Sequence, residues 1–145
     1  MVKLLVVSAV TVAALAGQAL SICSLVTVAD ATAILGVTAK QTRDPSGCGW
    51  EDATHKMNLN IAYVNVPTMF EAARAGNARK GKVQDEKDLG GPAFSTVPAN
   101  KANGGRVALY CLKQSTVLIV DLECAGAVDR LPQMRDVMRK LVPKP

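Results

Sequence analysis

The chain has 145 residues, of which 49% are hydrophobic, and a formal net charge of +5. A length and composition of this kind fit one folded domain with one core. Aromatic residues make up only 3% of the chain, which argues against an aromatic-lined groove or a base-stacking platform for nucleic acid. The net charge is ordinary for a soluble domain and indicates solubility rather than a particular partner.

Residues 1–21 have the features of a secretory signal peptide: an early cation at Lys3, an uncharged and mostly apolar stretch, and small residues near the end. The apolar stretch is shorter than the ~20 residues that span a bilayer, and no charged stop-transfer flank follows it. We therefore expect removal of the leader rather than a retained anchor. The small-x-small cleavage pattern is met twice, so cleavage after Ala19 and cleavage after Ser21 both stay open. The sequence predicts a secreted or periplasmic protein with a single domain at 22–145.

The first element predicted after the leader is a two-turn helix between Thr27 and Gly36. The Thr27 hydroxyl can accept from the third amide of this helix while Asp30 bonds back to the cap, and Gly36 can adopt the left-handed stop. The apolar residues between them fall on one side, which indicates a helix with one buried face.

Two strands are predicted next, in CGWED at 48–52 and in MNLNIAYVNV at 57–66, joined through ATHK. In the second segment apolar and polar residues alternate with a period of two, which is typical of a half-buried strand. One face consists of Met57, Leu59, Ile61 and Tyr63, and the other of Asn58, Asn60 and Ala62. One face of the sheet is therefore expected to meet solvent.

A second helix is predicted over 69–79, opened by a capping box between Thr68 and Glu71. Gly76 weakens a helix by about 1 kcal/mol relative to Ala, so we expect this helix to be short or frayed. The polar and basic stretch at 79–88 is predicted to be an exposed loop.

The remaining chain is mostly β in character. Strands are predicted at 93–97, 106–113 and 115–124, and the first two are joined through the turn PANKANGG. The last two are so close in sequence that a hairpin turning near Gln114 and Ser115 is expected.

A final helix is predicted from a cap at Asp129 to Leu141, with Pro132 in the first turn, where its missing amide does no harm. The order of elements is then helix, two strands, helix, three strands, helix, and the strands are linked mainly by short turns. This order predicts an α+β domain: an antiparallel β-sheet of about five strands with the helices packed on one face.

Four cysteines lie beyond the leader: Cys23, Cys48, Cys111 and Cys124. In a chain bound for an oxidising compartment disulfides are the default, and the sequence alone does not choose among the three possible pairings. The absence of a Cys-x-x-Cys spacing argues against a thioredoxin-like site and a zinc ribbon. We predict no metal site and no cofactor.

The pattern C-S-L-V-T-x-A-D-A-x-x-I-L-G at 23–36, G-C-x-W at 47–50, D-L-G-G-P-A-F at 88–94 and the closing hairpin and helix resemble the small secreted bacterial proteins of the DUF3558-like type. These proteins are largely uncharacterised, so the resemblance implies no reaction. It implies a secreted domain in which Cys23 and Cys48 are bridged. Many of these proteins are lipoproteins, but Ile22 stands where the lipid-attachment signal has a small residue, so a lipid on Cys23 is not expected.

The second pair of cysteines fits the predicted hairpin poorly. A turn near Ser115 places Cys111 opposite Leu118 and Ile119, too far from Cys124 for Cα atoms within ~7 Å. Either the hairpin register differs, or the two cysteines are free or paired elsewhere. We favour pairing of Cys111 with Cys124, because two free thiols are unusual in an oxidising compartment.

Other residues that could carry chemistry have simpler interpretations. His55, the only histidine, lies in the predicted turn ATHK, and as a general base it would need a nucleophile and an orienting carboxylate. The segment GNARKGK at 76–82 has the spaced glycines of a phosphate-binding loop, but Val83 replaces the magnesium-binding Ser or Thr. Trp50 is interpreted as a core anchor beside the Cys48 disulfide.

Two groups of charged residues are interpreted as solvated surface. The acidic group consists of Asp85, Glu86 and Asp88, and the basic group of Arg74, Arg79, Lys80 and Lys82. The basic group has no aromatic residues among it, which argues against a nucleic-acid surface.

Three functions stay open. The first is a non-enzymatic secreted or periplasmic domain that binds a protein or a small ligand through its sheet face or its loops at 79–104. The second is a small extracytoplasmic enzyme that uses His55, the acidic loop, or an unpaired Cys111 or Cys124. The third is a basic module for nucleic acid or anionic envelope polymers. We favour the first, because no catalytic constellation is found in the sequence.

Overall fold

The computed structural model of the chain describes residues 23–44, 47–98 and 105–142. The predicted leader and most of the predicted turn PANKANGG lie outside the described residues. Within the described ranges no helix has the length and apolar character needed to cross a membrane.

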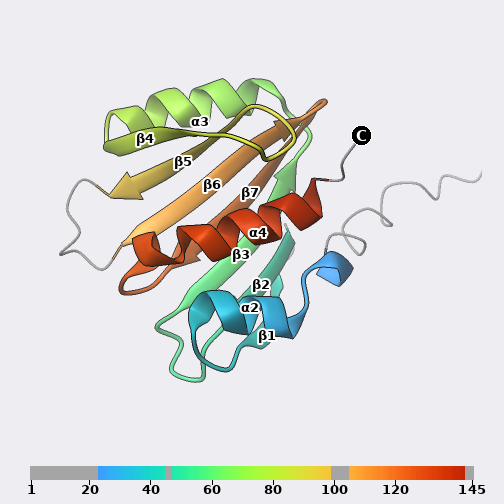
Figure 1. The fold of residues 1–145 in the computed structure, drawn as a ribbon, viewed down its shortest axis with the longest axis vertical. Helices are drawn as coiled ribbons and strands as arrows, with labels where there is room; N and C mark the ends of the chain where they lie inside the picture. The colour runs from blue at the N-terminus through green and yellow to red at the C-terminus, as the bar shows by residue number, and fades with distance from the viewer. Residues whose placement is uncertain (1–22, 45–46, 99–104, 143–145) are drawn as a thin grey trace, which may run out of the picture.

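A seven-stranded sheet, antiparallel throughout, runs across the domain (Figure 1). In chain order its strands are β1 (Lys40–Asp44), β2 (Gly47–Glu51), β3 (Asn58–Val64), β4 (Gly81–Glu86), β5 (Ala93–Pro98), β6 (Arg106–Lys113) and β7 (Thr116–Glu123). In space the order is β1-β2-β3-β7-β6-β5-β4. The predicted α+β class and antiparallel sheet are confirmed, whereas the predicted number of about five strands and the predicted order of elements are wrong.

The two strands that the prediction omits are β1 and β4, which form the two edges of the sheet. β4 occupies most of the segment that was expected to be a loop. β1 reads KQTRD and β4 reads GKVQDE, with Val83 as its one large apolar side chain. An edge strand pairs on one side only and often carries charged residues, so it needs no alternating apolar pattern. The signal that predicts the inner strands is therefore missing at both edges.

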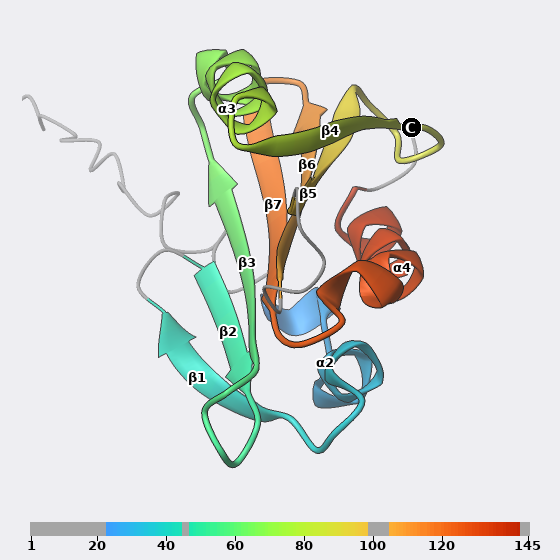
Figure 2. The same ribbon diagram turned by 90° about the vertical axis from the view of Figure 1, so that its left-hand side faces the viewer.

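Helices cover both faces of the sheet, so the predicted packing on one face is wrong. They are α2 (Val28–Leu35), α3 (Thr68–Ala78), the single-turn 3-10 helix η2 (Ala127–Arg130) and α4 (Leu131–Leu141). Figure 2 shows α2 and α4 on one side of the sheet and α3 on the other. α3 connects β3, in the middle of the sheet, to the edge strand β4, and it crosses the opposite face on the way. Its Phe70 packs there on Phe94 and Val117 in a small second core.

The helix ends agree with the predicted caps in one case of three. At α2 the Thr27 hydroxyl accepts from the Asp30 amide at 3.1 Å, and Gly36 has φ +73°, as predicted. At α3 the N-cap is Pro67, whose φ of −61° and ψ of −31° are already helical, so the predicted Thr68 box does not form. At α4 the preceding turn of η2 includes Asp129, and the N-cap is Arg130 without a side-chain bond. A side-chain cap needs an extended backbone at the cap residue, which neither site provides.

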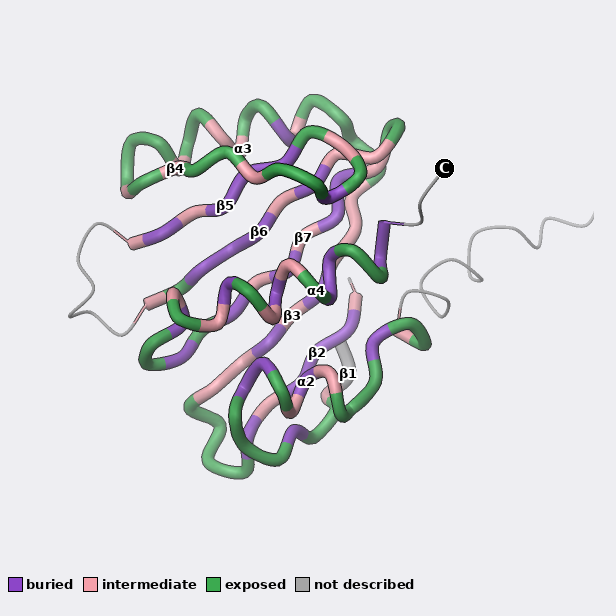
Figure 3. The backbone as a smooth tube through the Cα atoms, viewed as in Figure 1, coloured by how far each residue is buried: buried purple, intermediate pink, exposed green. Residues whose placement is uncertain are grey.

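The main hydrophobic core fills the space between the sheet and the helices α2 and α4 (Figure 3). Leu59 and Ile61 are 0% and 1% exposed there, so the predicted apolar face of β3 is confirmed. Trp50 is also buried in this core, in the same cluster as Cys48. The core therefore lies on one face of the sheet and is closed by two helices.

A disulfide joins Cys23 to Cys48, with 5.5 Å between their Cα atoms, and ties the chain before α2 to β2. This is the pairing that the resemblance implies, and a sulfur in a disulfide is not available to a lipid. The favoured pairing of Cys111 with Cys124 is wrong, because both are free buried thiols. Cys111 faces Leu118, while Cys124 lies beyond the Arg106 end of the same hairpin, six residues or about 20 Å along the strand. That distance is far beyond the reach of a disulfide.

Candidate functional site

The sheet face opposite α2 and α4 carries a row of paired residues that crosses the strands. From β1 to β5 the row consists of Thr42, Gly49, Asn60, Asp121, Ala108 and Thr96. These side chains are short and mostly polar, and we call this surface the open face. Gly49 permits their close approach, because a Cβ there would lie 2.4 Å from the Thr42 hydroxyl oxygen and 3.1 Å from Asn60 Oδ1. The solvent-facing side predicted for β3 thus extends over several strands.

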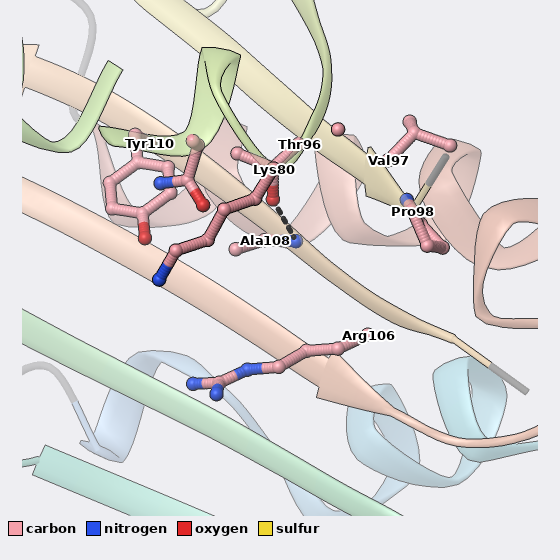
Figure 4. A pocket seen from close by; sticks show the side chains of 9 residues that line it. Lys80, Thr96, Val97, Pro98, Arg106, Ala108 and Tyr110 are labelled. Atoms are coloured by element: carbon pink, nitrogen blue, oxygen red, sulfur yellow. Dashed lines mark hydrogen bonds between the residues drawn. The ribbon is translucent and has the colours of Figure 1, made fainter. Parts of the chain in front are cut away.

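A cavity of about 330 Å³ lies where the open face meets the C-terminal end of α3 (Figure 4). Its polar lining consists of Asn77 and Lys80 from the end of α3 and the turn after it, Thr96 from β5, and Arg106 and Tyr110 from β6. Ala108 and Pro98 supply the apolar wall, whereas the Val97 side chain points into the main core on the other face of the sheet. In Figure 4 the Lys80 ammonium, the Tyr110 hydroxyl and the Arg106 guanidinium extend to the same side of the cavity.

Tyr110 is held in place by the small core under α3. Its ring stacks on Phe94, with ring centroids 4.6 Å apart, and Phe94 in turn meets Phe70 edge to face at 5.0 Å. Burial raises the pKa of Tyr110 above its ordinary value of 10.0, and the nearby charge of Asp121 adds to the increase. The hydroxyl therefore keeps its proton at neutral pH and can donate a hydrogen bond.

Arg106 is fixed by a carboxylate on the neighbouring strand. Its Nε donates to both oxygens of Asp121, at 2.9 and 3.0 Å, and its Nη2 donates to the same group. These bonds raise the pKa of Arg106 above its ordinary value, and the side chain is still 68% exposed. Within the described part of the chain, Nη1 has no hydrogen-bond partner. The guanidinium is thus oriented from one side and free on the other.

Lys80 and Thr96 complete the polar rim. Among the residues that the structure describes, Lys80 forms no ion pair. The Thr96 hydroxyl oxygen accepts from the Ala108 amide at 3.2 Å, which leaves the hydroxyl proton free to donate. The cavity therefore presents two cations and two hydroxyl donors over a small apolar wall, an arrangement suited to holding a ligand.

The structure places His55 away from this cavity, in the turn between β2 and β3. Its Nδ1 lies 2.8 Å from Glu51 Oε2, and the side chain is 70% exposed. Asp52 does not orient the imidazole, because it accepts from the amides of Lys56 and Met57, both at 2.9 Å, and from the Thr54 hydroxyl. These bonds, that from Thr54 first, lower the pKa of Asp52 to about 2. This carboxylate shapes the turn.

The two free thiols are poor nucleophiles. Cys111 and Cys124 are 0% and 5% exposed, and burial raises the pKa of each above its ordinary value of 9.0. A reactive cysteine needs a lowered pKa and access to solvent. The arrangement of the hairpin also keeps the two thiols far apart, at opposite ends of β6 and β7.

The acidic and basic groups of the sequence do not form a joint site. Two of the acidic residues are used in ion pairs, and two of the basic residues lie on opposite faces of the sheet. Asp85 pairs with Arg74, and Glu86 receives two hydrogen bonds from Arg135 of α4. Lys82 lies on β4 opposite Val97, on the α4 side, whereas Lys80 lines the cavity. In the described ranges no three His, Cys, Asp or Glu side chains are grouped so that they could hold a metal ion.

The sequence indicated this cavity only in part. The sequence places Lys80 in the basic group and predicts that the sheet face and the 79–104 loops form a binding region. Arg106, Tyr110 and Asn77 were missed. The hairpin register was a usable signal for Arg106, because a turn at Gln114 and Ser115 places it diagonally from Asp121.

No protein-family model matches the chain, and no curated protein matches it. Among solved structures, the solution structure of cyanobacterial PsbP (CyanoP) from Synechocystis sp. PCC 6803 is similar over 71% of this chain and 78% of that chain, with 9% sequence identity and a TM-score of 0.42. A likeness of this level carries no argument about what this chain binds.

Proposed function

We propose that the chain is a non-enzymatic extracytoplasmic binding domain whose ligand surface is the open face and its cavity. One observation carries the proposal: the cavity is rimmed by the donors Lys80, Arg106 and Tyr110, of which Arg106 and Tyr110 are held in place by their neighbours, and the thiols and the histidine of the described residues lie outside it. A cavity with hydrogen-bond donors over an apolar wall, and with no cysteine or histidine in its lining, is suited to binding a ligand.

The extracytoplasmic location is supported by two features. The Cys23–Cys48 disulfide is typical of oxidising compartments, and residues 1–21 read as a secretory leader. Membership of the DUF3558-like secreted proteins belongs to the same proposal, on the short motifs around Cys23 and Cys48. The location is tested by the intact mass of the secreted product, measured under non-reducing conditions after expression of the whole sequence. We expect a chain that starts after Ala19 or Ser21 and contains one disulfide. An unprocessed chain with four thiols contradicts the location.

The binding role is tested by amide-resolved NMR with a set of small acids, amines and neutral amides. Compounds that bind should shift the amides of Thr96, Ala108 and Tyr110. The matched control is Ala108→Leu, which fills the cavity without changing its charge and should remove these shifts. Ligands that map to the α2 and α4 side, or a set in which no compound binds the open face, would contradict the proposal.

A further inference from the structure

We infer that the cavity takes a small organic acid, with its anionic head between the Lys80 ammonium and the free edge of the Arg106 guanidinium and a short apolar body on Pro98 and Ala108. The inference rests on the proposed binding function and adds the chemical class of the ligand. It depends on the charge of the rim, the orientation of Arg106, and the size of the cavity.

The charge of the lining favours an anion. The lining includes two cations, Lys80 and Arg106, and no acidic side chain. Asp121 and Glu123 lie on β7, where they face Arg106 from the side of the neighbouring strand and offset part of its charge. Lys80 therefore supplies the unpaired positive charge, and a carboxylate is the group that completes the pair.

The orientation of Arg106 favours a carboxylate head over a diffuse cloud of counterions. Asp121 engages Nε and Nη2, so the direction of Nη1 is set before a ligand arrives. A donor held in one direction loses little freedom on binding, and a planar guanidinium matches the oxygens of a carboxylate. The hydroxyl protons of Tyr110 and Thr96 can bond the same head or a polar group next to it.

The size and walls of the cavity limit the ligand. A volume of about 330 Å³ lies near the lower end of the range for small-molecule sites. The wall made by Pro98 and Ala108 offers an apolar surface to the body of the ligand. An anionic polymer needs many cations along one surface, and here Lys82 lies on the other face of the sheet from Lys80.

The test is an NMR titration of the secreted, oxidised protein with benzoate, its neutral analogue benzamide, and inorganic phosphate. We expect benzoate to shift the amides of Thr96, Ala108 and Tyr110 and to bind about tenfold more tightly than benzamide, the effect of one charge-assisted contact. Lys80→Gln should weaken benzoate about fivefold. Lys82→Gln removes the same charge two residues away on the opposite face and should leave the affinity within about twofold.

Each contrary result has its own meaning. Equal affinity for benzoate and benzamide at these amides overturns the anionic head and leaves the binding function standing. Phosphate that binds as tightly as benzoate, with the same dependence on Lys80, overturns the apolar body. Equal losses from Lys80→Gln and Lys82→Gln show that general surface charge, rather than the cavity, attracts the acid. Failure of all three probes, when compounds of the wider set still bind the open face, sinks this inference alone.

Discussion

Two neighbouring rows of residues cross the same strands and have opposite surroundings. The covered row consists of Cys48, Ile61, Val120, Leu109 and Ser95, and the row on the open face consists of Gly49, Asn60, Asp121, Ala108 and Thr96. Each member of one row is the chain neighbour of a member of the other, because successive side chains of a strand point to opposite faces. Every residue of the covered row is at most 2% exposed.

The two faces of the same strands therefore have different roles: one face stabilises the fold and the other is available for binding. The covered row is closed by α2 and α4, and its apolar members belong to the main core. Beside its counterpart on the open face α3 packs through Phe70 on Phe94 of β5 and Val117 of β7, and the row ends in the cavity. Substitutions on the covered side should therefore change the free energy of unfolding, and substitutions on the open face should change it little.

The largest effect is expected from Ile61→Ala on the covered row. Ile61 is 1% exposed and lies between Cys48 and Val120. Truncation removes buried methyl groups and leaves a cavity in a close-packed core, so the free energy of unfolding should fall by about 4 kcal/mol. Urea unfolding of the oxidised protein measures this loss. A loss below about 1 kcal/mol would show that the covered row is not tightly packed and would remove the contrast between the rows.

The same contrast explains which parts of the fold could be predicted. In β3 the alternation of Leu59 and Ile61 with Asn58 and Asn60 shows both the strand and its two faces. In the last hairpin the short link between β6 and β7 fixes the pairing of Lys113 with Thr116, and with it the position of Cys111 opposite Leu118. Where local pattern and short links determine the structure, the sequence was sufficient.

Features that depend on distant pairing could not be predicted. β1 and β4 lack alternation because edge strands need little apolar surface. The face of the sheet on which α3 packs depends on the position of β4 at the edge of the sheet. No local sequence pattern predicts that position. The cavity combines Lys80 with Arg106 and Tyr110, residues that meet only after β4, β5 and β6 have paired. Lys80 was therefore interpreted as ordinary surface charge.

A second large effect is expected when the disulfide is removed from the covered side. Cys23 and Cys48 lie 25 positions apart in the sequence, and a crosslink over a loop of this length stabilises by about 3 kcal/mol in the chain-entropy model. The paired variant Cys23→Ala with Cys48→Ala should lose this amount in urea unfolding, and reduced wild type should behave like it. A paired variant as stable as the oxidised wild type would contradict the role of this crosslink.

A smaller loss is expected from Glu86→Gln, which weakens the link between β4 and α4. The Glu86 side chain is 6% exposed and receives bonds from Arg135 Nε at 2.7 Å, from Arg135 Nη2 at 2.9 Å and from the Ser95 hydroxyl at 2.7 Å. Loss of the charge should cost about 2 kcal/mol at pH 7.

The pH dependence of stability checks the same contact. Burial acts to raise the pKa of Glu86, but the bonds from Arg135 and Ser95 outweigh it and lower the pKa below 4.5. The stabilisation is therefore present above the unfolded-state pKa and is lost as the pH falls through the folded-state pKa. The difference between wild type and Glu86→Gln should shrink over the range from about pH 5 down through the folded-state pKa. A difference that stays constant over this range would show that Glu86 contributes no charge-dependent stability.

The smallest effect is expected from Asn60→Ala, the chain neighbour of the first substitution. Asn60 faces Gly49 and Asp121 on the open face and is partly exposed. Because the Asn60 side chain is partly in contact with solvent, its removal leaves no buried cavity, and the free energy of unfolding should change by less than about 0.5 kcal/mol. The pair Ile61→Ala and Asn60→Ala thus compares two faces at one point of one strand. A loss at Asn60 of about 2 kcal/mol or more would show that the open face is packed as tightly as the covered face at this strand, and would remove the contrast between the rows.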